Sequence, residues 1–254
     1  MRLASLHIKN FRGLQDVEFS APTPATVIVG PNAIGKTTLL EAVRLARCLL
    51  MPSYPGEEQQ VLIALSILQP NTQRLSLEAM LGNPALPLEI KLGIELTEAE
   101  LGRLEGNVSV LAQVHLRNSL SLPAGQEQLA LFQFLSSPIG RTKLVEATEE
   151  IKKKVSELRS AGRLLYPTLV ADPKGESLSG KDLLDQELVG FLGRTLPVGT
   201  GLFSYFPADR AMPTGEVAIQ IGAADVQAQI QSHMGQPATK YSRLKQYIVN
   251  QSST

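Results

Sequence analysis

The segment Gly30-Pro31-Asn32-Ala33-Ile34-Gly35-Lys36-Thr37 fits the P-loop pattern G-x-x-x-x-G-K-S/T, and it decides how the rest of the chain is interpreted. Successive backbone N–H groups of such a loop can wrap a phosphate chain, and the N-terminus of the following helix adds its own positive end. We expect Lys36 to reach the terminal phosphates and the Thr37 hydroxyl to bind Mg²⁺, which makes these two the predicted catalytic residues. Nucleotide binding is assigned to the loop and the start of the helix: Gly30, Pro31, Asn32, Ala33, Ile34, Gly35, Lys36, Thr37 and Thr38.

The flanking sequence fits a P-loop as well. Residues 25–29 are a short β-branched run, which predicts a buried central strand. Residues 36–50 contain no Gly or Pro and carry apolar residues at helical spacing, and Pro52 is expected to end this helix. Its polar stripe is formed by Glu41, Arg44 and Arg47. The context favours the P-loop over a glycine turn that holds a structural lysine.

The composition is that of a soluble globular chain. Of the 254 residues 43% are hydrophobic, and 24 basic residues balance 24 acidic ones. This excludes wholesale disorder and any argument from a global basic field, so that a nucleic-acid site must be local or lie elsewhere in an assembly. We find no apolar run of about 18 residues and no signal-peptide layout, and we expect a cytoplasmic protein without membrane contact.

Cysteine and histidine usage gives no sign of a metal centre. Cys48 is the single cysteine, which excludes an internal disulfide framework and a cysteine-based zinc site. It lies in the predicted helix and is expected to pack in the core. His7, His115 and His233 have no metal-ligand spacing.

Alternating apolar residues predict several strands. Residues 3–9 and 14–19 should pair as a hairpin. Further strands are expected at 74–81, 88–96, 108–116, 202–206 and 217–221. Thr97 and Glu100 form a capping-box pattern at the start of a short helix.

Helical spacing dominates the later part of the chain. Helices are expected over 126–163, 183–192, 223–234 and 241–249. Three segments follow from this pattern: a nucleotide-binding lobe with a β-rich subdomain (1–122), a mainly helical insertion (123–200), and a return to the core with a helical C-terminal segment (201–254). Within the insertion, the run Lys152-Lys153-Lys154 is either a contact for DNA phosphates or the solvated side of an amphipathic helix.

Two motifs together resemble the SMC/RecF/OLD group of ABC-type ATPases, in which OLD stands for overcoming lysogenisation defect. Members open with I-x-N-F-R and continue about twenty residues later with G-x-N-x-x-G-K-S/T. The matching positions in this chain are Asn10, Phe11, Arg12, Gly30, Asn32, Gly35, Lys36 and Thr37. The resemblance covers roughly the first fifty residues. It implies an α/β fold, a P-loop NTPase head of the ABC type with a β-rich N-terminal lobe and helical additions.

The resemblance also implies chemistry and partners. Such heads bind ATP with Mg²⁺ between two copies, so a homodimer or higher oligomer is expected, acting on DNA or on an attached nuclease or toxin. Arg12 would contact the nucleotide or the partner head; the alternative is an exposed arginine at the hairpin turn. In residues 206–210, which resemble the segment near the Q-loop position, Asp209 would be a further Mg²⁺ contact. A Pro-Asp-Arg turn closed by its own hydrogen bonds remains the alternative there, and no glutamine stands at the Q-loop place.

Two motifs of the group are not evident. The best Walker B candidate is residues 169–172, but Pro173 follows Asp172 where Glu is expected. Ser179-Gly180-Lys181 is too short for a signature motif and is interpreted as a helix cap. The chain therefore looks like the N-terminal half of an ATPase head, completed by residues beyond 254 or by a separate polypeptide.

Three functions are compatible with these observations. The leading one is a RecF/OLD-like ATPase of DNA repair or phage defence. The second is a non-catalytic ATP-binding switch or scaffold module completed by a partner polypeptide. The third, a small-molecule kinase or a GTPase, lacks its usual lid arginines or N-K-x-D motif.

Overall fold

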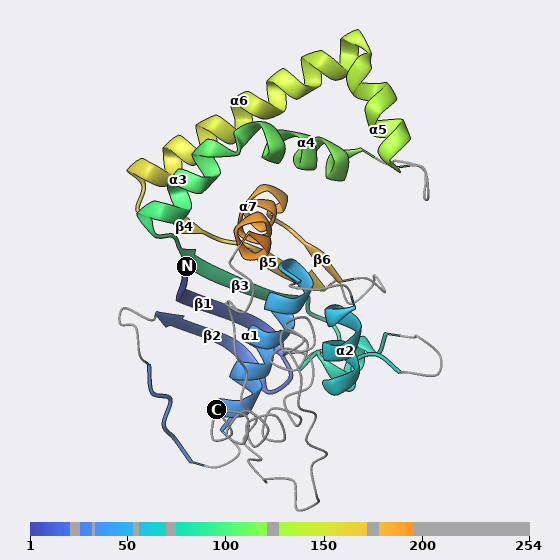
Figure 1. The fold of residues 1–254 in the computed structure, drawn as a ribbon. Helices are drawn as coiled ribbons and strands as arrows, with labels where there is room; N and C mark the ends of the chain where they lie inside the picture. The colour runs from blue at the N-terminus through green and yellow to red at the C-terminus, as the bar shows by residue number, and fades with distance from the viewer. Residues whose placement is uncertain are drawn as a thin grey trace, which may run out of the picture.

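A computed structural model describes residues 1–20, 26–31, 34–52, 56–69, 75–120, 127–171 and 178–195. The fold of these residues is mixed α/β, as predicted, with an antiparallel sheet, helices beside it and a long helical arm (Figure 1). The strands are β1 (Arg2–Phe11), β2 (Leu14–Ser20), β3 (Leu88–Glu95), β4 (Leu164–Leu165), β5 (Thr168–Ala171) and β6 (Leu178–Gly180). The helices are α1 (Lys36–Leu50), α2 (Glu57–Ala64), the 3-10 helix η1 (Leu77–Ala79), α3 (Glu98–Gly106), α4 (Val108–Ser119), α5 (Glu127–Ser136), α6 (Pro138–Ser160) and α7 (Leu183–Arg194).

The sheet is built around the predicted hairpin of β1 and β2. Its strand order is β2-β1-β3-β5-β6, with β4 paired to β3, and every pair of strands among the described residues is antiparallel. Leu6 stands between Phe19 on β2 and Leu92 on β3. Because side chains alternate along a strand, this register turns Leu6 and Ile8 together toward the core.

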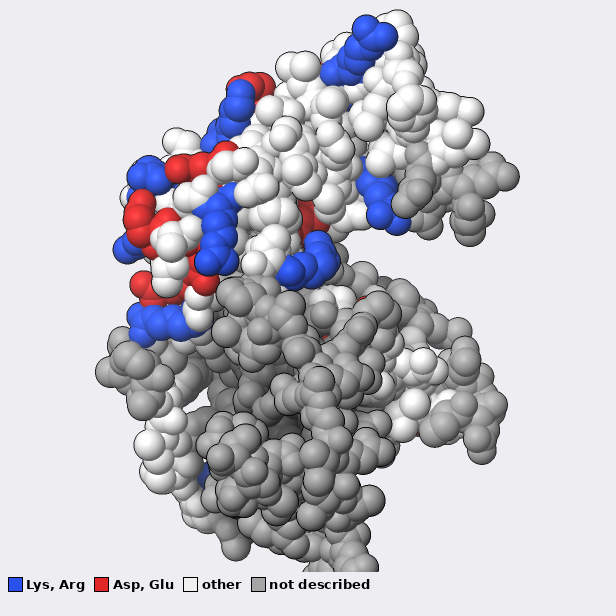
Figure 2. Space-filling model, viewed as in Figure 1, with Lys and Arg blue, Asp and Glu red and all other residues white. Residues whose placement is uncertain are grey.

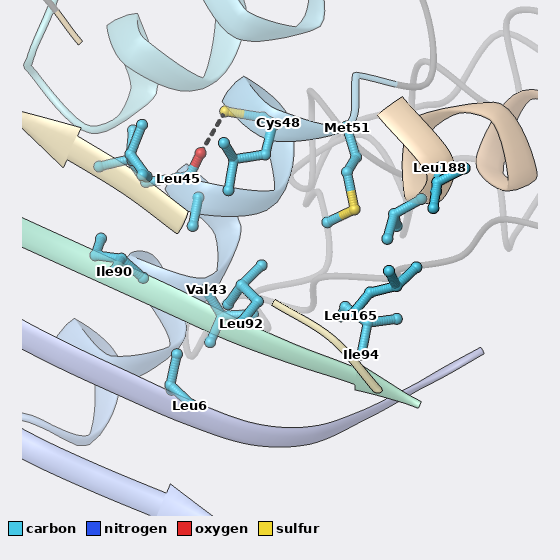
Figure 3. Packing of buried hydrophobic residues seen from close by; sticks show 14 of the residues in the cluster. Leu6, Val43, Leu45, Cys48, Met51, Ile90, Leu92, Ile94, Leu165 and Leu188 are labelled. Carbon is cyan, nitrogen blue, oxygen red and sulfur yellow. Dashed lines mark hydrogen bonds between the residues drawn. The ribbon is translucent and has the colours of Figure 1, made fainter. Parts of the chain in front are cut away.

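Helix α1 covers the inner face of the sheet. It packs on β1, β3 and β5, and Figure 3 shows Val43 and Leu45 of α1 beside Leu6, Ile90 and Leu92 of the strands. The core placement of Cys48 is confirmed, since its side chain is buried and its thiol donates to the Leu45 carbonyl over 3.1 Å. Burial raises the pKa of this thiol to about 12, so it is an inert packing group.

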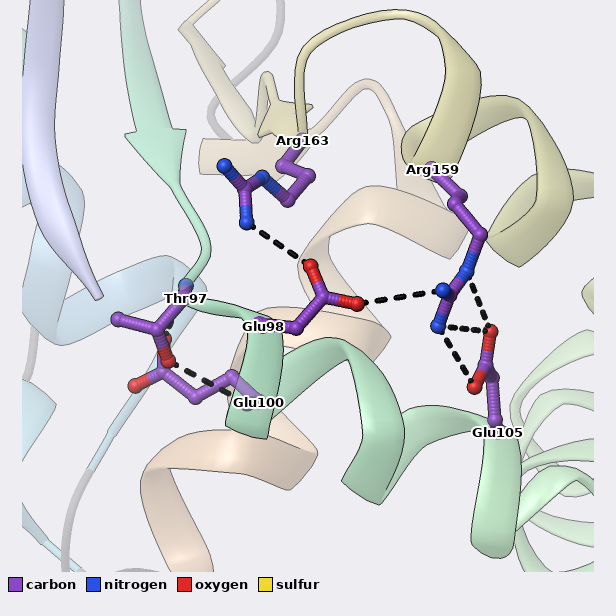
Figure 4. Close-up of polar contacts among 6 residues, drawn as sticks. All are labelled: Thr97, Glu98, Glu100, Glu105, Arg159 and Arg163. Carbon is purple, nitrogen blue, oxygen red and sulfur yellow. Dashed lines mark hydrogen bonds and ion pairs between the residues drawn. The ribbon is translucent and has the colours of Figure 1, made fainter.

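The arm consists of α3 to α6 and leaves the sheet between β3 and β4 (Figure 1). Its root begins with the predicted capping box, in which Thr97 accepts from the Glu100 amide and Glu100 accepts from the Thr97 amide. Figure 4 shows the other ties at the root: Arg159 binds Glu105 with two hydrogen bonds of 3.0 Å, and Glu98 pairs with both Arg159 and Arg163. These exposed pairs each contribute only a few tenths of a kcal/mol to about 1 kcal/mol.

Helix α7 lies between the arm and the sheet, and polar groups join it to both. On the arm side, Glu187 accepts from Asn118 over 2.8 Å and contacts His115 Nδ1 at 2.7 Å. Lys154 of α6 forms an ion pair with Asp185, whose second oxygen accepts from the Tyr166 amide beside β5.

The lysine run of α6 therefore has partners within the arm and head. Lys154 is held by Asp185, and Lys152 pairs with Glu149 at 2.8 Å, whereas Lys153 is exposed. On the face drawn in Figure 2, basic and acidic side chains are interspersed along the arm. This favours the solvated side of an amphipathic helix over a site for DNA phosphates.

Two predicted strands are wrong. Residues 108–116 form helix α4, because Leu111, Ala112 and Leu116 are buried at helical spacing, and this packing overrides the strand propensity of the valines. In the segment 74–81, Leu75 makes a single bridge to Leu68 and the chain then turns into η1. Met80 and Leu81 are both buried although they are neighbours, which a two-residue alternation does not allow.

Other predictions are confirmed or extended. The helices expected over 126–163 and 183–192 appear as α5, α6 and α7. Helix α2 is not among the predicted helices; it starts directly after Gly56, which has a φ of 83°. Among the described residues no helix is long and apolar enough to cross a membrane. The segment 201–254 lies outside the described residues.

The capping box at the arm root generates a pH-dependent prediction. Burial alone would raise the pKa of the Glu100 carboxyl, but hydrogen bonds from the Met1 α-ammonium and from Thr97 outweigh it, and the net pKa is lowered. The carboxylate therefore stabilises the fold at neutral pH, and this contribution is lost as the pH falls through the lowered pKa. Glu100→Gln should reduce the free energy of unfolding at pH 7 by about 1 kcal/mol. Urea denaturation at pH 7 and in acid measures the difference.

The matched control is Glu105→Gln, which changes an exposed carboxylate of the same helix and should cost less. In acid below the lowered pKa, the Glu100→Gln variant and the unchanged chain should become equally stable. A difference that persists there would contradict the assigned role.

Candidate nucleotide-binding site

The site begins at the N-terminus of α1, which Gly35 caps without a side chain. Gly35 has a φ of 96°, the first turn of α1 carries no acidic residue, and the first hydrogen bond closing the helix runs from the Leu39 amide to the Gly35 carbonyl. The amides of Lys36, Thr37 and Thr38 therefore lack acceptors within the helix. Together with the helix dipole, these donors suit an anion, and no carboxylate of the first turn competes for them.

The Lys36 side chain folds back over the loop. Its ammonium donates to the Gly30 carbonyl over 2.8 Å and to the Pro31 carbonyl over 2.6 Å. Thr37 is exposed at the helix start, so its hydroxyl is accessible. Lysine, hydroxyl and uncapped amides thus converge on one end of α1, an arrangement that fits a phosphate chain with its Mg²⁺.

The predicted strand before the loop is absent. Residues 26–30 are described and lie outside the sheet, with Val27 83% and Val29 84% exposed. A β-branched run becomes a buried strand only when neighbouring strands pair with it, and none of the described strands lies beside this one. Residues 26–29 thus have the β propensity of a strand, but no described strand pairs with them.

The hairpin of β1 and β2 contacts the start of α1 and so supports the loop. A Cβ atom built on Gly35 would lie 3.0 Å from Leu14 Cδ2, so the helix start rests directly on the first residue of β2. Asn10 has a φ of 56° and a buried side chain that donates to the carbonyls of Asn83 and Leu86 and accepts from the Asn83 amide. These bonds tie the turn to the segment that leads into β3.

Arg12 in the same turn is engaged on several sides. Its guanidinium pairs with Glu41 of α1, donates to the Leu65 carbonyl over 2.8 Å and to the Ala79 carbonyl over 3.2 Å. Its amide donates to the Met80 carbonyl over 2.6 Å. Arg12 is thus a turn residue as one interpretation held, but it is half-buried and bound to three elements rather than freely exposed.

The polar stripe expected on α1 does not face solvent. Arg44 and Arg47 are buried, and Arg47 forms a buried ion pair with Glu57 of α2. Helix α2, which the sequence pattern does not predict, supplies the carboxylate that pairs with Arg47.

Several predicted site residues lie outside the described part of the chain. These are Asn32, Ala33, Asp172 and Asp209. The apolar part of the Walker B candidate forms β5, between β3 and β6. Ser179 and Gly180 belong to strand β6, so their interpretation as a helix cap is wrong; α7 starts later, after Asp182. Within the described ranges, no three His, Cys, Asp or Glu residues gather as a metal site.

Comparison with known proteins matches the region that builds this site. Residues 1–46 match the family described as AAA ATPase domain. The DNA replication and repair protein RecF of Synechococcus sp. (strain JA-2-3B'a(2-13)) is 53% identical over 45 residues, which are 18% of this chain and 12% of that protein. RecF of Acaryochloris marina is 57% identical over 47 residues, with the same shares. RecF of Thermosynechococcus vestitus is 30% identical over 106 residues, 42% of this chain and 26% of that protein.

The matched stretches thus span about an eighth to a quarter of these relatives. No solved structure matches the chain. The N-terminal region is therefore similar to the AAA ATPase domain and to the N-terminal part of RecF proteins, which confirms the resemblance drawn from Asn10, Phe11, Arg12 and the P-loop.

Gly35 provides a test of the contact between the β1–β2 hairpin and the start of α1. Gly35→Ala should destabilise the chain by more than about 1 kcal/mol, because alanine tolerates a positive φ poorly and its methyl group would press on Leu14. Gly102→Ala in α3 is the matched control, since no atom lies within 4 Å of its added Cβ and alanine favours a helix. Thermal and urea unfolding should therefore give changes of opposite sign. Equal changes in the two variants would refute the special role of Gly35.

Proposed function

We propose that this chain is the ATP-binding part of a RecF-like ATPase head that works in DNA repair. One observation carries the proposal. The Lys36 ammonium lies in a P-loop at the uncapped start of α1, and this helix start rests on the I-x-N-F-R turn. The name of the matched relatives, which act in DNA replication and repair, supplies the biological setting.

Each residue has a distinct part in the proposed site. The ammonium of Lys36, which now bridges two loop carbonyls, would bind the β- and γ-phosphates. The exposed Thr37 hydroxyl would hold Mg²⁺, with Asp209 as the proposed further carboxylate. The free amides of the first helical turn, with the loop residues Gly30 to Ile34, would surround the phosphate chain. Bound Mg²⁺ would neutralise charge on the phosphates during hydrolysis.

Turnover needs more than these residues. Phosphoryl transfer depends on positioning and on a group that orients the attacking water. We propose that this group comes from residues outside the described ranges or from a second polypeptide. On this view two heads close on ATP, and the complete cytoplasmic assembly acts on DNA. A role in phage defence, with a nuclease or toxin as effector, is the other setting proposed for the same site.

A second candidate is a non-catalytic ATP-binding module. The observation that favours it is the sequence Asp172-Pro173, where a Walker B strand would continue with Asp-Glu. ATP would then act as a structural ligand that closes the head onto a partner. Turnover measured with DNA present separates this candidate from the ATPase.

Lys36→Ala should abolish Mg-ATP binding, because the variant loses the charge that faces the phosphates. Isothermal titration of the 254-residue chain with Mg-ATP measures this. A loss of affinity of at least about a hundredfold is expected. The control is Lys153→Ala, which removes an exposed lysine of the arm and should leave the affinity unchanged. Equal affinity of the Lys36→Ala variant and the unchanged chain would refute the proposed site.

A further inference from the structure

The ion pair of Arg12 and Glu41 joins the two sequence motifs of the nucleotide site. Arg12 belongs to the turn that follows β1, and Glu41 belongs to the helix that follows the P-loop. Both side chains are partly buried, with 28% and 22% of their surface exposed. An ion pair in this setting is shielded from solvent more than the exposed pairs of the arm root and can hold a fixed geometry.

The position of Glu41 on α1 explains how this ion pair can affect the nucleotide site. Glu41 lies four residues after Thr37, and residues at this spacing share one face of a helix. The pair therefore holds the face of α1 that presents Thr37. Six residues before Glu41, Gly35 rests on Leu14 of the same hairpin. An apolar contact and an ionic contact thus fix both the height of α1 and its rotation about its own axis.

The remaining bonds of Arg12 fix the guanidinium itself. Nη2 donates to the Leu65 carbonyl after α2, and Nε donates to the Ala79 carbonyl at the end of η1. With Glu41, these acceptors come from three separate segments. A planar guanidinium bound along three of its nitrogen atoms has little freedom to swing toward a ligand.

We propose that Arg12 is a positioning residue that acts on the nucleotide through Glu41 and makes no contact with the phosphates. The pair sets the rotation of α1 and so aims Thr37 and Lys36. This role rests on the proposed ATP site, and it replaces the direct nucleotide contact expected from the resemblance. Loss of either partner has the same consequence, because the helix loses the same restraint.

A double-mutant cycle distinguishes the two roles of Arg12. Arg12→Ala, Glu41→Gln and the double variant are compared with the unchanged 254-residue chain by titration with Mg-ATP and, separately, with Mg-ADP. If Arg12 acts through Glu41, each single variant binds about tenfold more weakly and the double variant is no weaker than either single one. The loss is equal for ATP and ADP, since Lys36 and Thr37 serve both.

A direct contact to the terminal phosphate gives a different pattern. Arg12→Ala then loses more affinity for ATP than for ADP, Glu41→Gln leaves the affinity unchanged or tightens it, and the effects add. That result would overturn the positioning role while the ATP site stands. If the unchanged chain does not bind Mg-ATP, the proposed function itself fails, and this role falls with it.

Control variants separate positioning from general loss of structure. Arg159→Gln and Glu105→Gln break an exposed ion pair at the arm root and should leave both affinities unchanged. Arg12→Lys keeps the charge but loses the fork that binds three acceptors. Its affinity should lie between those of the Arg12→Ala variant and the unchanged chain if the pair with Glu41 matters. Thermal melting of every variant before titration confirms that the folded chain is being measured, and Glu41→Gln, which keeps the side-chain volume, carries the test where Arg12→Ala does not fold.

Discussion

The structure depends on the contact between the β1–β2 turn and the first turn of α1. On the hairpin side, Leu14 offers an apolar surface and Arg12 a positive charge. On the helix side, Gly35 can approach Leu14 closely, and the Glu41 carboxylate pairs with Arg12. This contact positions the N-terminal end of α1, and later residues of the helix, such as Val43 and Leu45, pack in the core against β1 and β3 (Figure 3). The direction of Lys36 is therefore determined by the hairpin as much as by the loop that carries it.

This contact explains why the two motifs occur together. Taken singly, the I-x-N-F-R motif is a strand end: Asn10 binds the segment before β3, Phe11 is buried, and Arg12 reaches three elements. Taken singly, the P-loop is a phosphate site at a helix start. In the fold, the first motif holds the second in place. The arm is joined to this head by the chain itself at β3 and β4, and also through α7, whose Asp185 and Glu187 bind residues of α6 and α4.

The sequence predicted those parts whose periodicity agrees with their surroundings. Local pattern and tertiary packing favour the same structure in the hairpin, α1, β3 and the capping box at Thr97, and these elements are predicted correctly. The failures share a cause. Residues 108–116 and the stripe of Arg44 and Arg47 were decided by neighbours that the pattern could not reveal, α6 and α2 respectively. For the site, the motif placed Lys36 and Thr37 correctly at the helix start, but the pair of Arg12 with Glu41 joins residues 29 apart in the chain, and no local signal announces it.

Amide hydrogen exchange of the whole chain, with and without Mg-ATP, tests most directly whether the turn and the nucleotide site form one unit. If they do, ATP should slow exchange in the first turn of α1 and also at two amides beside the β1–β2 turn. These are the amide of Arg12, which donates to the Met80 carbonyl, and the amide of Gly82, which donates to the Asn10 carbonyl. Protection confined to the loop and the helix start, with the turn unchanged, would contradict the account. It would mean that nucleotide binding at the P-loop does not affect the stability of the hairpin turn.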